Sequence, residues 1–320
     1  RQTRQHNDQA TGKSLDDYRA HKRLGRDIYG PLFLANRQLA RGIPRCCSVS
    51  VSTGRVYWPI KISNRREAKM ARFDDQIAVI TGAGSGLGYA TAQRLAKEGA
   101  TVALLDLNFD TATTAAKKID SGQKSARAYS VDVGKWESVD KAMEKVISDL
   151  GQPDILVNCA GIGKFVRSEL ETQENWERII GVNLTGTFLM CRSVLPGMIE
   201  KKSGSIVNVA SNAGLMGQPY SAAYCASKGG VVNLTRALAV EYRSLGVRVN
   251  AVAPGGMNTP MIDTWGFPEG ASSKDFARIM SPLGNSEPAE IAALIAFIAS
   301  NDGRYMVGQI VGMDGGITCG

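Results

Sequence analysis

Histidine is nearly absent from this chain of 320 residues, which contains only His6 and His21. Beyond residue 21 no histidine can serve as a general base or a metal ligand, so proton transfer there must use another side chain. The six cysteines form no C-x-x-C pair and have no companion histidines at metal-ligand spacing. We therefore expect no bound metal, and reduced thiols in a cytoplasmic protein rather than a disulfide framework.

Long apolar runs and an even spread of positive charge are also missing. No uninterrupted run of about 18 apolar residues occurs, so we expect no membrane-spanning helix. Residues 1–69 hold 15 of the 38 Lys and Arg residues but only 5 of the 30 Asp and Glu residues. The net charge of +8 therefore arises in this segment, and residues 70–320 give no bulk signal for nucleic-acid binding.

Residues 1–69 lack a methionine and show no sustained helical or strand period. Met70 begins "MARFDDQIAVITG", a short polar lead into a first strand. We expect residues 1–69 to be a non-native upstream or disordered basic segment, and residues 70–320 to form one catalytic domain. The alternative for the first segment is a basic arm that binds RNA or an acidic partner.

Apolar runs alternate with helical patterns from Met70 onward. The strand candidates are apolar on both faces, as strands buried in a parallel sheet should be: 76–81, 101–105, 127–133, 154–159, 204–210, 247–252 and 308–313. Helix candidates lie near 86–98, 109–120, 136–150, 174–201, 221–245 and 287–300. This alternation predicts an α/β fold, a single Rossmann-type doubly wound domain with a seven-stranded parallel sheet flanked by helices.

A glycine-rich loop, "TGAGSGLG" at 81–88, follows the first predicted strand and opens the first predicted helix. Its glycines permit a tight turn, close approach of the backbone to a pyrophosphate and close helix–strand packing. The helix N-terminus then offers N–H groups and a positive dipole end to an anion. Glycines can also occur in an ordinary turn at the end of a strand. The strand–loop–helix context favours a dinucleotide site over that interpretation.

An acidic residue, Asp106, ends the second predicted strand 18 residues beyond Gly88. A carboxylate at this position can accept hydrogen bonds from both ribose hydroxyls of adenosine. It would repel a 2′-phosphate, and no arginine adjoins it to offset that repulsion. The sequence therefore favours NAD over NADP, against the simpler interpretation of an aspartate that ends a strand in a turn.

Tyr224 and Lys228 lie four residues apart in the predicted helix 221–245 and so share one helix face. Taken alone, such a pair is better interpreted as a half-buried tyrosine beside a solvated lysine with no catalytic role. Ser211 lies 13 residues before Tyr224 at the end of a predicted strand, and Asn183 lies in an earlier helix. Together with the glycine loop, this placement favours an active site in which a tyrosine transfers the proton.

These residues resemble the short-chain dehydrogenase/reductase family over essentially all of Met70–Gly320. The Tyr-x-x-x-Lys signature, the serine at its usual spacing and the glycine loop are joined by further matching segments: "VDV" (131–133), "NCAG" (158–161), "VNL" (182–184), "PGGMNT" (254–259) and "MDGG" (313–316). One position departs from the family, because Cys159 replaces an asparagine. We interpret this cysteine as an ordinary core residue and not as a nucleophile.

The resemblance implies a catalytic tetrad of Asn183, Ser211, Tyr224 and Lys228. It also implies a homotetramer, a dimer of dimers. From the charge distribution and the lack of long apolar runs, we expect no nucleic-acid or membrane partner. The implied cofactor-binding residues are Gly82, Ser85, Gly86, Leu87, Gly88, Asp106, Leu107, Asp132, Val133, Asn158, Ala160, Gly161, Tyr224, Lys228, Pro254, Gly255, Met257 and Thr259.

The expected chemistry is hydride exchange between a secondary alcohol and NAD, with Tyr224 as general acid and base. A nearby ammonium favours a phenolate, so we expect Lys228 to lower the pKa of Tyr224. By resemblance, Lys228 also binds the nicotinamide ribose and Asn183 holds a water that links Lys228 to solvent. Ser211 would hold the substrate oxygen and stabilise the charge that develops there.

The segment 258–285 corresponds to the family's lid over the substrate, and its Met261, Trp265, Phe267 and Phe276 favour an apolar pocket. We expect a small-molecule secondary alcohol or ketone, hydrophobic or alicyclic. Two alternatives stay open. One is an enzyme like the 3-oxoacyl-[acyl-carrier-protein] reductases, and the other is a non-catalytic NAD-binding protein on the same fold.

Overall fold

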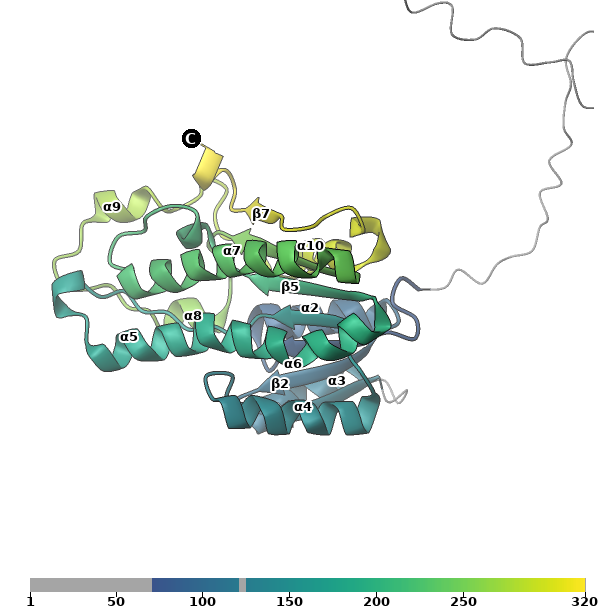
Figure 1. Cartoon of the computed structure of the whole chain (residues 1–320). Helices are drawn as coiled ribbons and strands as arrows, with labels where there is room; N and C mark the ends of the chain where they lie inside the picture. Colours follow the sequence, from purple (N-terminus) through teal and green to yellow (C-terminus); the bar gives the residue numbers. More distant parts are fainter. Residues whose placement is uncertain (1–70, 121–124, 320) are drawn as a thin grey trace, which may run out of the picture. The chain divides into compact units, whose positions relative to one another are not determined.

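The computed structural model describes residues 71–120 and 125–319 (Figure 1). The expectation for residues 1–69 lies outside the described residues, and the domain boundary at Met70 stays a prediction.

Seven parallel strands form one sheet in the order β3-β2-β1-β4-β5-β6-β7. This confirms the fold class that the alternating pattern predicted. Because β1 pairs with both β2 and β4, the strand order reverses around it and opens a crevice at the carboxyl ends of the strands. The strands are β1 Ile77–Thr81, β2 Thr101–Asp106, β3 Ala126–Ser130, β4 Ile155–Asn158, β5 Gly204–Val209, β6 Val247–Pro254 and β7 Ile310–Met313.

Helices cover both faces of this sheet and make three layers (Figure 1). Successive residues along a strand point to opposite faces of the sheet. Ile80 packs in the core with α2 and α10, whereas its neighbour Val79 packs with α4 and α6. The main helices are α2 Gly86–Lys97, α3 Phe109–Ile119, α4 Trp136–Leu150, α5 Gln173–Ile180, α6 Gly186–Lys201, α7 Ala222–Tyr242 and α10 Pro288–Ala299.

Shorter helices connect these elements. Helices α8 (Pro260–Asp263) and α9 (Ser273–Ala277) lie in the predicted lid. A π-helical turn, Gly181–Thr185, joins α5 to α6, and such turns occur frequently at functional sites. The 3₁₀ turns are Ser168–Leu170, Asn212–Gly214, Arg243–Leu245, Asn301–Gly303 and Ile317–Cys319.

The third strand is shorter than the sequence predicted, ending at Ser130 rather than at residue 133. The reason is a turn around Asp132. Its carboxylate accepts a hydrogen bond from the N–H of Gly134 at 3.1 Å, and its carbonyl accepts one from the N–H of Lys135. This turn directs Asp132 and Val133 toward the crevice instead of extending the sheet.

One described helical stretch, Gln173–Lys201, is by length and composition apolar enough to cross a membrane, which counting uninterrupted apolar runs did not predict. Half of its apolar window is buried inside the protein. Its second part, α6, packs on the sheet through Leu189, Met190 and Met198. A core helix passes the same test, so the finding carries little weight for a membrane location.

Buried polar side chains join the middle of the sheet to α7. Asn158 and Asn208 are register partners on β4 and β5, and the amide of Asn158 donates to the Asn208 side-chain oxygen at 2.9 Å. The Asn208 amide in turn donates to the hydroxyl of Thr235 on α7 at 2.9 Å. All three side chains are almost fully buried, so their hydrogen bonds are costly to break.

The half-buried guanidinium of Arg248 makes hydrogen bonds at the amino ends of the strands, away from the crevice. Arg248 on β6 donates to the carbonyls of Ile298, Ala299, Ser300 and Gly303 at 2.9–3.2 Å, and also to the Ser205 hydroxyl. Ile298 and Ala299 end α10, where the helix itself supplies no partners for their carbonyls, whereas the carbonyls of Ser300 and Gly303 also accept from backbone N–H groups. Burial lowers the pKa of Arg248.

Replacing Arg248 with alanine should lower the free energy of unfolding by about 2–4 kcal/mol, since the carbonyls of Ile298 and Ala299 lose their donor. Urea denaturation followed by circular dichroism would measure the change. Arg304→Ala, at an exposed position just beyond the same helix end, is the matched control and should cost less than about 0.5 kcal/mol. Equal losses for the two variants would contradict this role of Arg248.

Candidate active site

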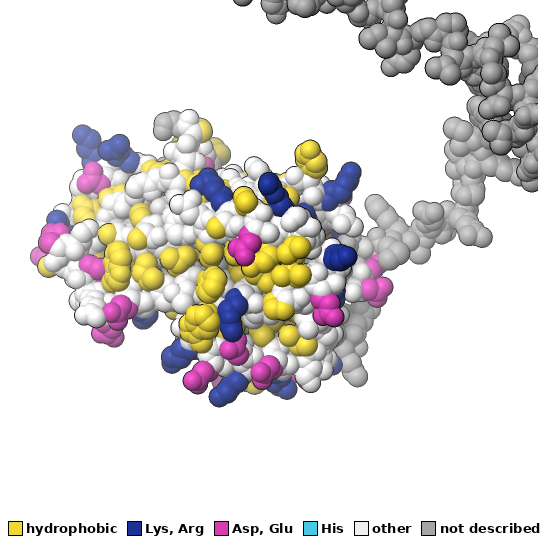
Figure 2. Space-filling view, in the orientation of Figure 1, with side chains coloured by type: hydrophobic (Ala, Val, Ile, Leu, Met, Phe, Trp, Pro, Cys, Tyr) yellow, Lys and Arg dark blue, Asp and Glu magenta, His cyan; other side chains and the backbone are white. Residues whose placement is uncertain are grey.

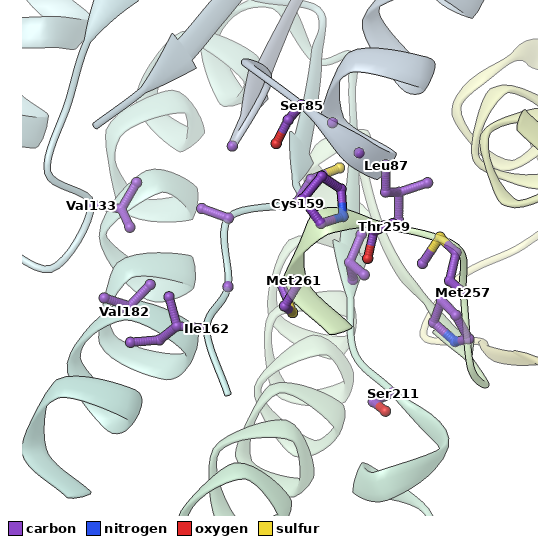
Figure 3. Close-up of a pocket in the computed structure, with 18 of the residues that line it drawn as sticks. Ser85, Leu87, Val133, Cys159, Ile162, Val182, Ser211, Met257, Thr259 and Met261 are labelled. Atoms are coloured by element: carbon purple, nitrogen blue, oxygen red, sulfur yellow. The ribbon is translucent and has the colours of Figure 1, made fainter. Parts of the chain in front are cut away.

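A cavity of about 320 Å³ opens at the carboxyl ends of the central strands, where the topology predicts a ligand site. Figure 3 shows Ser85 and Ser211 at opposite ends of this cavity, with Cys159 and Met261 between them. The glycine loop, the end of β2, the segment after β4 and the first turns of α7 all contribute to its walls.

The glycine loop has the geometry that a pyrophosphate requires. Gly82 and Gly86 have φ angles of +63° and +51°, a region that disfavours other residues. A Cβ at Gly88 would lie only 2.2 Å from the carbonyl oxygen of Gly82, so this position admits no side chain. The first turn of α2 contains no acidic residue, and the N-cap Ser85 makes no side-chain capping bond. The N-terminus of α2 therefore fits an anionic group.

Asp106 occupies the expected position for a ribose ligand. One of its carboxylate oxygens accepts a hydrogen bond from the Gly84 N–H at 2.9 Å, and the other accepts one from the Asn108 N–H at 3.0 Å. These bonds hold the carboxylate at the rim of the cavity. Each oxygen retains a second lone pair that can accept a hydroxyl proton. The residues present thus fit an adenosine ribose beside the glycine loop.

Every predicted cofactor residue except Asn158 lines this cavity. Asn158 is 3% exposed, and its amide donates to Asn208 in the core, so its side chain does not face the cavity. The sequence reasoning missed Cys159, Ile162, Val182 and Val209, which also line the walls. Cys159 and Val182 lie inside the quoted segments 158–161 and 182–184, and Ile162 and Val209 lie within two residues of a predicted site residue. Position within or beside the motifs was the available signal.

The tyrosine, the lysine and the serine meet at the inner end of the cavity. Tyr224 and Lys228 lie on the buried face of α7, at 9% and 4% exposed. The ammonium of Lys228 lies 5.7 Å from the centre of the Tyr224 ring and donates to the Val209 carbonyl at 2.7 Å. The Ser211 hydroxyl accepts from the Ala213 N–H and donates to the Asn212 side chain.

The pKa of Tyr224 differs from the expectation. Burial raises it to about 12, and a hydrogen bond with Ser211 opposes this rise only in part. Burial also lowers the pKa of Lys228 to about 8. The expected lowering of the Tyr224 pKa by Lys228 is therefore wrong for the protein without cofactor, because desolvation of the phenolate outweighs a lysine that points at Val209.

Asn183 lies behind the cavity wall in the π-helical turn. Its side-chain oxygen accepts from the Ile162 N–H at 2.8 Å, and its amide donates to the Ile162 carbonyl and to the Ser227 hydroxyl. The side chain thus braces the segment after β4 against α7. Its contact with a water stays a prediction. The side-chain amide already donates both of these hydrogen bonds to protein atoms.

A second, larger cavity of about 620 Å³ adjoins the first and shares Ser211 and Tyr224 with it. The predicted lid residues Met261, Trp265, Phe267 and Phe276 all line it, together with Phe165. The Trp265 ring packs edge-on against the Phe165 and Tyr224 rings, with centroid distances of 4.7 and 4.8 Å. The described side chains of this lining include no charged group, so the cavity suits a neutral ligand.

Arg167 and Tyr220 anchor the tip of the lid. The guanidinium of Arg167 donates to the carbonyls of Glu269 and Gly270 and lies 5.7 Å from the centre of the Tyr220 ring. The Tyr220 hydroxyl accepts from the Ser272 N–H at 3.1 Å, and its ring stacks on Phe276. These contacts hold the aromatic face of the lid over the second cavity.

Comparison with known proteins agrees with this geometry. The family model described as short chain dehydrogenase matches residues 76–268. The meso-2,3-butanediol dehydrogenase of Serratia marcescens is 41% identical over 77% of this chain and 96% of its own length. The cis-4-hydroxycyclohexanecarboxylate dehydrogenase of Sinomonas cyclohexanicum is also 41% identical, over 77% of this chain and 98% of its own length.

A solved structure shows the same fold. The 3-ketoacyl-(acyl-carrier-protein) reductase from Brucella melitensis, complexed with NADH, superposes with a TM-score of 0.70 at 36% sequence identity. The match covers 77% of this chain and 99% of that chain. The family match and this likeness together support a nicotinamide cofactor for this chain.

The buried Lys228 makes stability depend on pH. Its pKa is about 8 in the folded protein and about 10.5 when unfolded, so above pH 8 the unfolded chain binds more protons and stability rises with pH. Between about pH 7 and about pH 9.5, the wild-type protein should gain about 2 kcal/mol relative to Lys228→Met. Urea denaturation at several pH values would measure this gain.

Lys97→Met, at an exposed position near the end of α2, is the control and should retain the wild-type slope. Staying below about pH 10 keeps the ionisation of Tyr224 out of the measurement. Parallel pH profiles for the wild type and Lys228→Met would show that burial does not perturb this lysine.

Proposed function

The chain belongs to the short-chain dehydrogenase family, and from this premise we propose that it is an NAD-dependent oxidoreductase interconverting a secondary alcohol and a ketone. One observation carries the proposal. Ser211 and Tyr224 line both the cofactor cavity and the second cavity, whose described side chains carry no charge, so a substrate oxygen beside them would adjoin the nicotinamide end of the cofactor site. Oxidoreductases that act on CH–OH groups require this juxtaposition.

Each side chain then has a defined task. Tyr224 takes the proton of the alcohol, or returns it to the ketone, while Ser211 holds the same oxygen. The ammonium of Lys228, beneath the Tyr224 ring, stabilises the phenolate that forms. Asn183 keeps the segment after β4 in place through Ile162. When bound, the nicotinamide supplies the acceptor or donor of the hydride.

The raised pKa of Tyr224 bears on the direction of proton transfer. With a pKa of about 12 in the protein without cofactor, the phenol keeps its proton at neutral pH and is ready to protonate a ketone. Oxidation of an alcohol needs the phenolate, which is favoured by positive charge close to the ring. Lys228 supplies part of that charge, since its pKa of about 8 leaves it mostly protonated at pH 7.

We propose a hydrophobic or alicyclic substrate. The second cavity is walled by aromatic and aliphatic side chains and has the size of a small-molecule site. Two of the relatives act, by their names, on a small diol and on a substituted cyclohexane. The sequence motifs and the cavity are thus in keeping with a compact secondary alcohol.

Two other functions remain as candidates. The name of the Brucella structure favours reduction of 3-ketoacyl groups on an acyl carrier protein, although Arg167, near the lid, already donates to two lid carbonyls. A non-catalytic NAD-binding protein would also use this fold, but every member of the expected tetrad is present.

The proposal includes a homotetramer in the cytoplasm. Figure 2 shows a band of hydrophobic side chains over α5, α6 and α7. Exposed apolar residues on these helices include Trp176, Phe188 and Val240. Large exposed apolar patches often mark protein contacts, and sedimentation equilibrium of the full chain would test the assembly.

Tyr224→Phe should lower kcat by roughly 10²–10⁴-fold, because it removes the proton-transfer group and keeps the ring. Cofactor binding, followed by NADH fluorescence, should survive the change. Tyr242→Phe, near the end of the same helix and far from both cavities, is the matched control. Full activity of Tyr224→Phe with a secondary alcohol that the wild-type protein oxidises would refute the proposed mechanism.

Asp106→Ala should weaken NAD use by roughly 10–100-fold in kcat/KM, because the ribose loses its charged acceptor. The same change should leave NADP use unchanged or improved, since it removes the repulsion of a 2′-phosphate. Parallel assays with the two cofactors would measure the ratio, with Asp110→Ala on the exposed first turn of α3 as control. A variant with an unaltered NAD preference would contradict the assignment of Asp106.

A further inference from the structure

Two buried polar atoms in the second cavity have no partner. They are the side-chain oxygen of Gln218 and the indole nitrogen of Trp265. Three other such atoms occur in the described part of the chain, in Thr91, Thr113 and Asn158, and none of those residues lines this cavity. An unpaired buried polar atom costs about 1–3 kcal/mol of stability. Two such atoms in one ligand cavity therefore indicate that a bound ligand supplies their hydrogen-bond partners.

The two atoms have complementary needs. The Gln218 oxygen can only accept a hydrogen bond, whereas the Trp265 N–H can only donate one. A hydroxyl group both donates and accepts, so a single hydroxyl can satisfy either atom or both. A carboxylate could not pair with the Gln218 oxygen, and the described lining offers no cation to balance it. The polar group that suits this position is neutral.

Both residues lie close to the catalytic tyrosine. The backbone carbonyl of Gln218 accepts a hydrogen bond from the thiol of Cys225, the residue directly after Tyr224. The Trp265 ring lies edge-on to the Tyr224 ring at 4.8 Å. The ring also lies over Gly163, where a Cβ would come within 2.1 Å of it. The unpaired atoms therefore belong to residues that line the same cavity as Tyr224 and contact it or its chain neighbour.

From these observations we propose that Gln218 and Trp265 form a subsite for a second hydroxyl group, and that the substrate is a neutral diol whose two hydroxyls are close together. This inference rests on the proposed function and narrows its substrate class. Tyr224 and Ser211 receive the hydroxyl that is oxidised, and the subsite receives the one that is retained. The product is then a hydroxyketone.

The test compares cyclohexane-1,2-diol, as separate cis and trans isomers, with cyclohexanol, using NAD as oxidant. The wild-type protein should show a kcat/KM at least about 10-fold higher for one diol isomer than for cyclohexanol. In Gln218→Met, which keeps the length of the side chain, this ratio should fall by roughly 10–100-fold, mainly through KM for the diol. Trp265→Phe, which keeps a ring but lacks the N–H, should lower the same ratio.

Gln93→Met, on the exposed face of α2, is the matched control and should leave the ratio unchanged. A wild-type protein that oxidises cyclohexanol but shows no preference for either diol isomer would overturn the inference. So would a Gln218→Met variant with the wild-type ratio, which would mean that water alone pairs with these atoms.

A binding measurement separates this inference from the proposed function. Calorimetric titration of NADH-loaded Tyr224→Phe with the same three compounds reports recognition without turnover. If the diol binds more tightly than cyclohexanol, and Gln218→Met in the same background abolishes the difference, the subsite stands even when the wild-type protein oxidises none of them. If cyclohexanol is oxidised but the diol has no advantage in binding or rate, the proposed function stands and the subsite does not.

Discussion

The hydrogen bonds that run from Asn158 through Asn208 to Thr235 fix the geometry on which the active site depends. They join β4, β5 and α7 inside the core, where a broken bond has no water to replace it. Ser211 lies two residues beyond the end of β5, and Tyr224 and Lys228 lie on α7. A shift of α7 along the sheet would separate the serine from the tyrosine, and it would also leave buried amides unpaired. The core thus holds the two elements that carry the proposed catalytic residues in a fixed relative position.

The two cavities that meet at Tyr224 differ in physical character. The cofactor cavity has fixed polar groups at its rim, including the end of α2 and the carboxylate of Asp106. The second cavity is charge-free among its described side chains and is covered by an aromatic lid. Tyr224 lies at the boundary and takes its raised pKa from burial. Burial excludes water from the reaction, but it also raises the free energy of the Tyr224 phenolate unless a positive charge lies close to the ring.

Much of this molecule could be predicted from its sequence. Apolar strands and helical periods predicted the parallel sheet, and the spacing of the glycine loop, Asp106, Ser211 and Tyr224 predicted which residues meet at one edge. The failures have physical reasons. Whether Asn158 faces the cavity or the core depends on its register partner across β4 and β5, which no local pattern encodes. The pKa of Tyr224 depends on desolvation by distant segments, and the unpaired atoms of Gln218 and Trp265 carry no sequence signature.

The lack of a side chain at Gly163 leaves space for the Trp265 ring, and this affects how the substrate range can change by mutation. Gly163 has no positive φ angle, so its backbone tolerates other residues, yet a single methyl group there would collide with the Trp265 ring. A Gly-to-Ala replacement needs one base change in the codon and would push the indole toward Tyr224 or out of the cavity. Substrate range can therefore drift in one mutational step at a residue outside both cavity linings, while the residues that perform the chemistry stay the same.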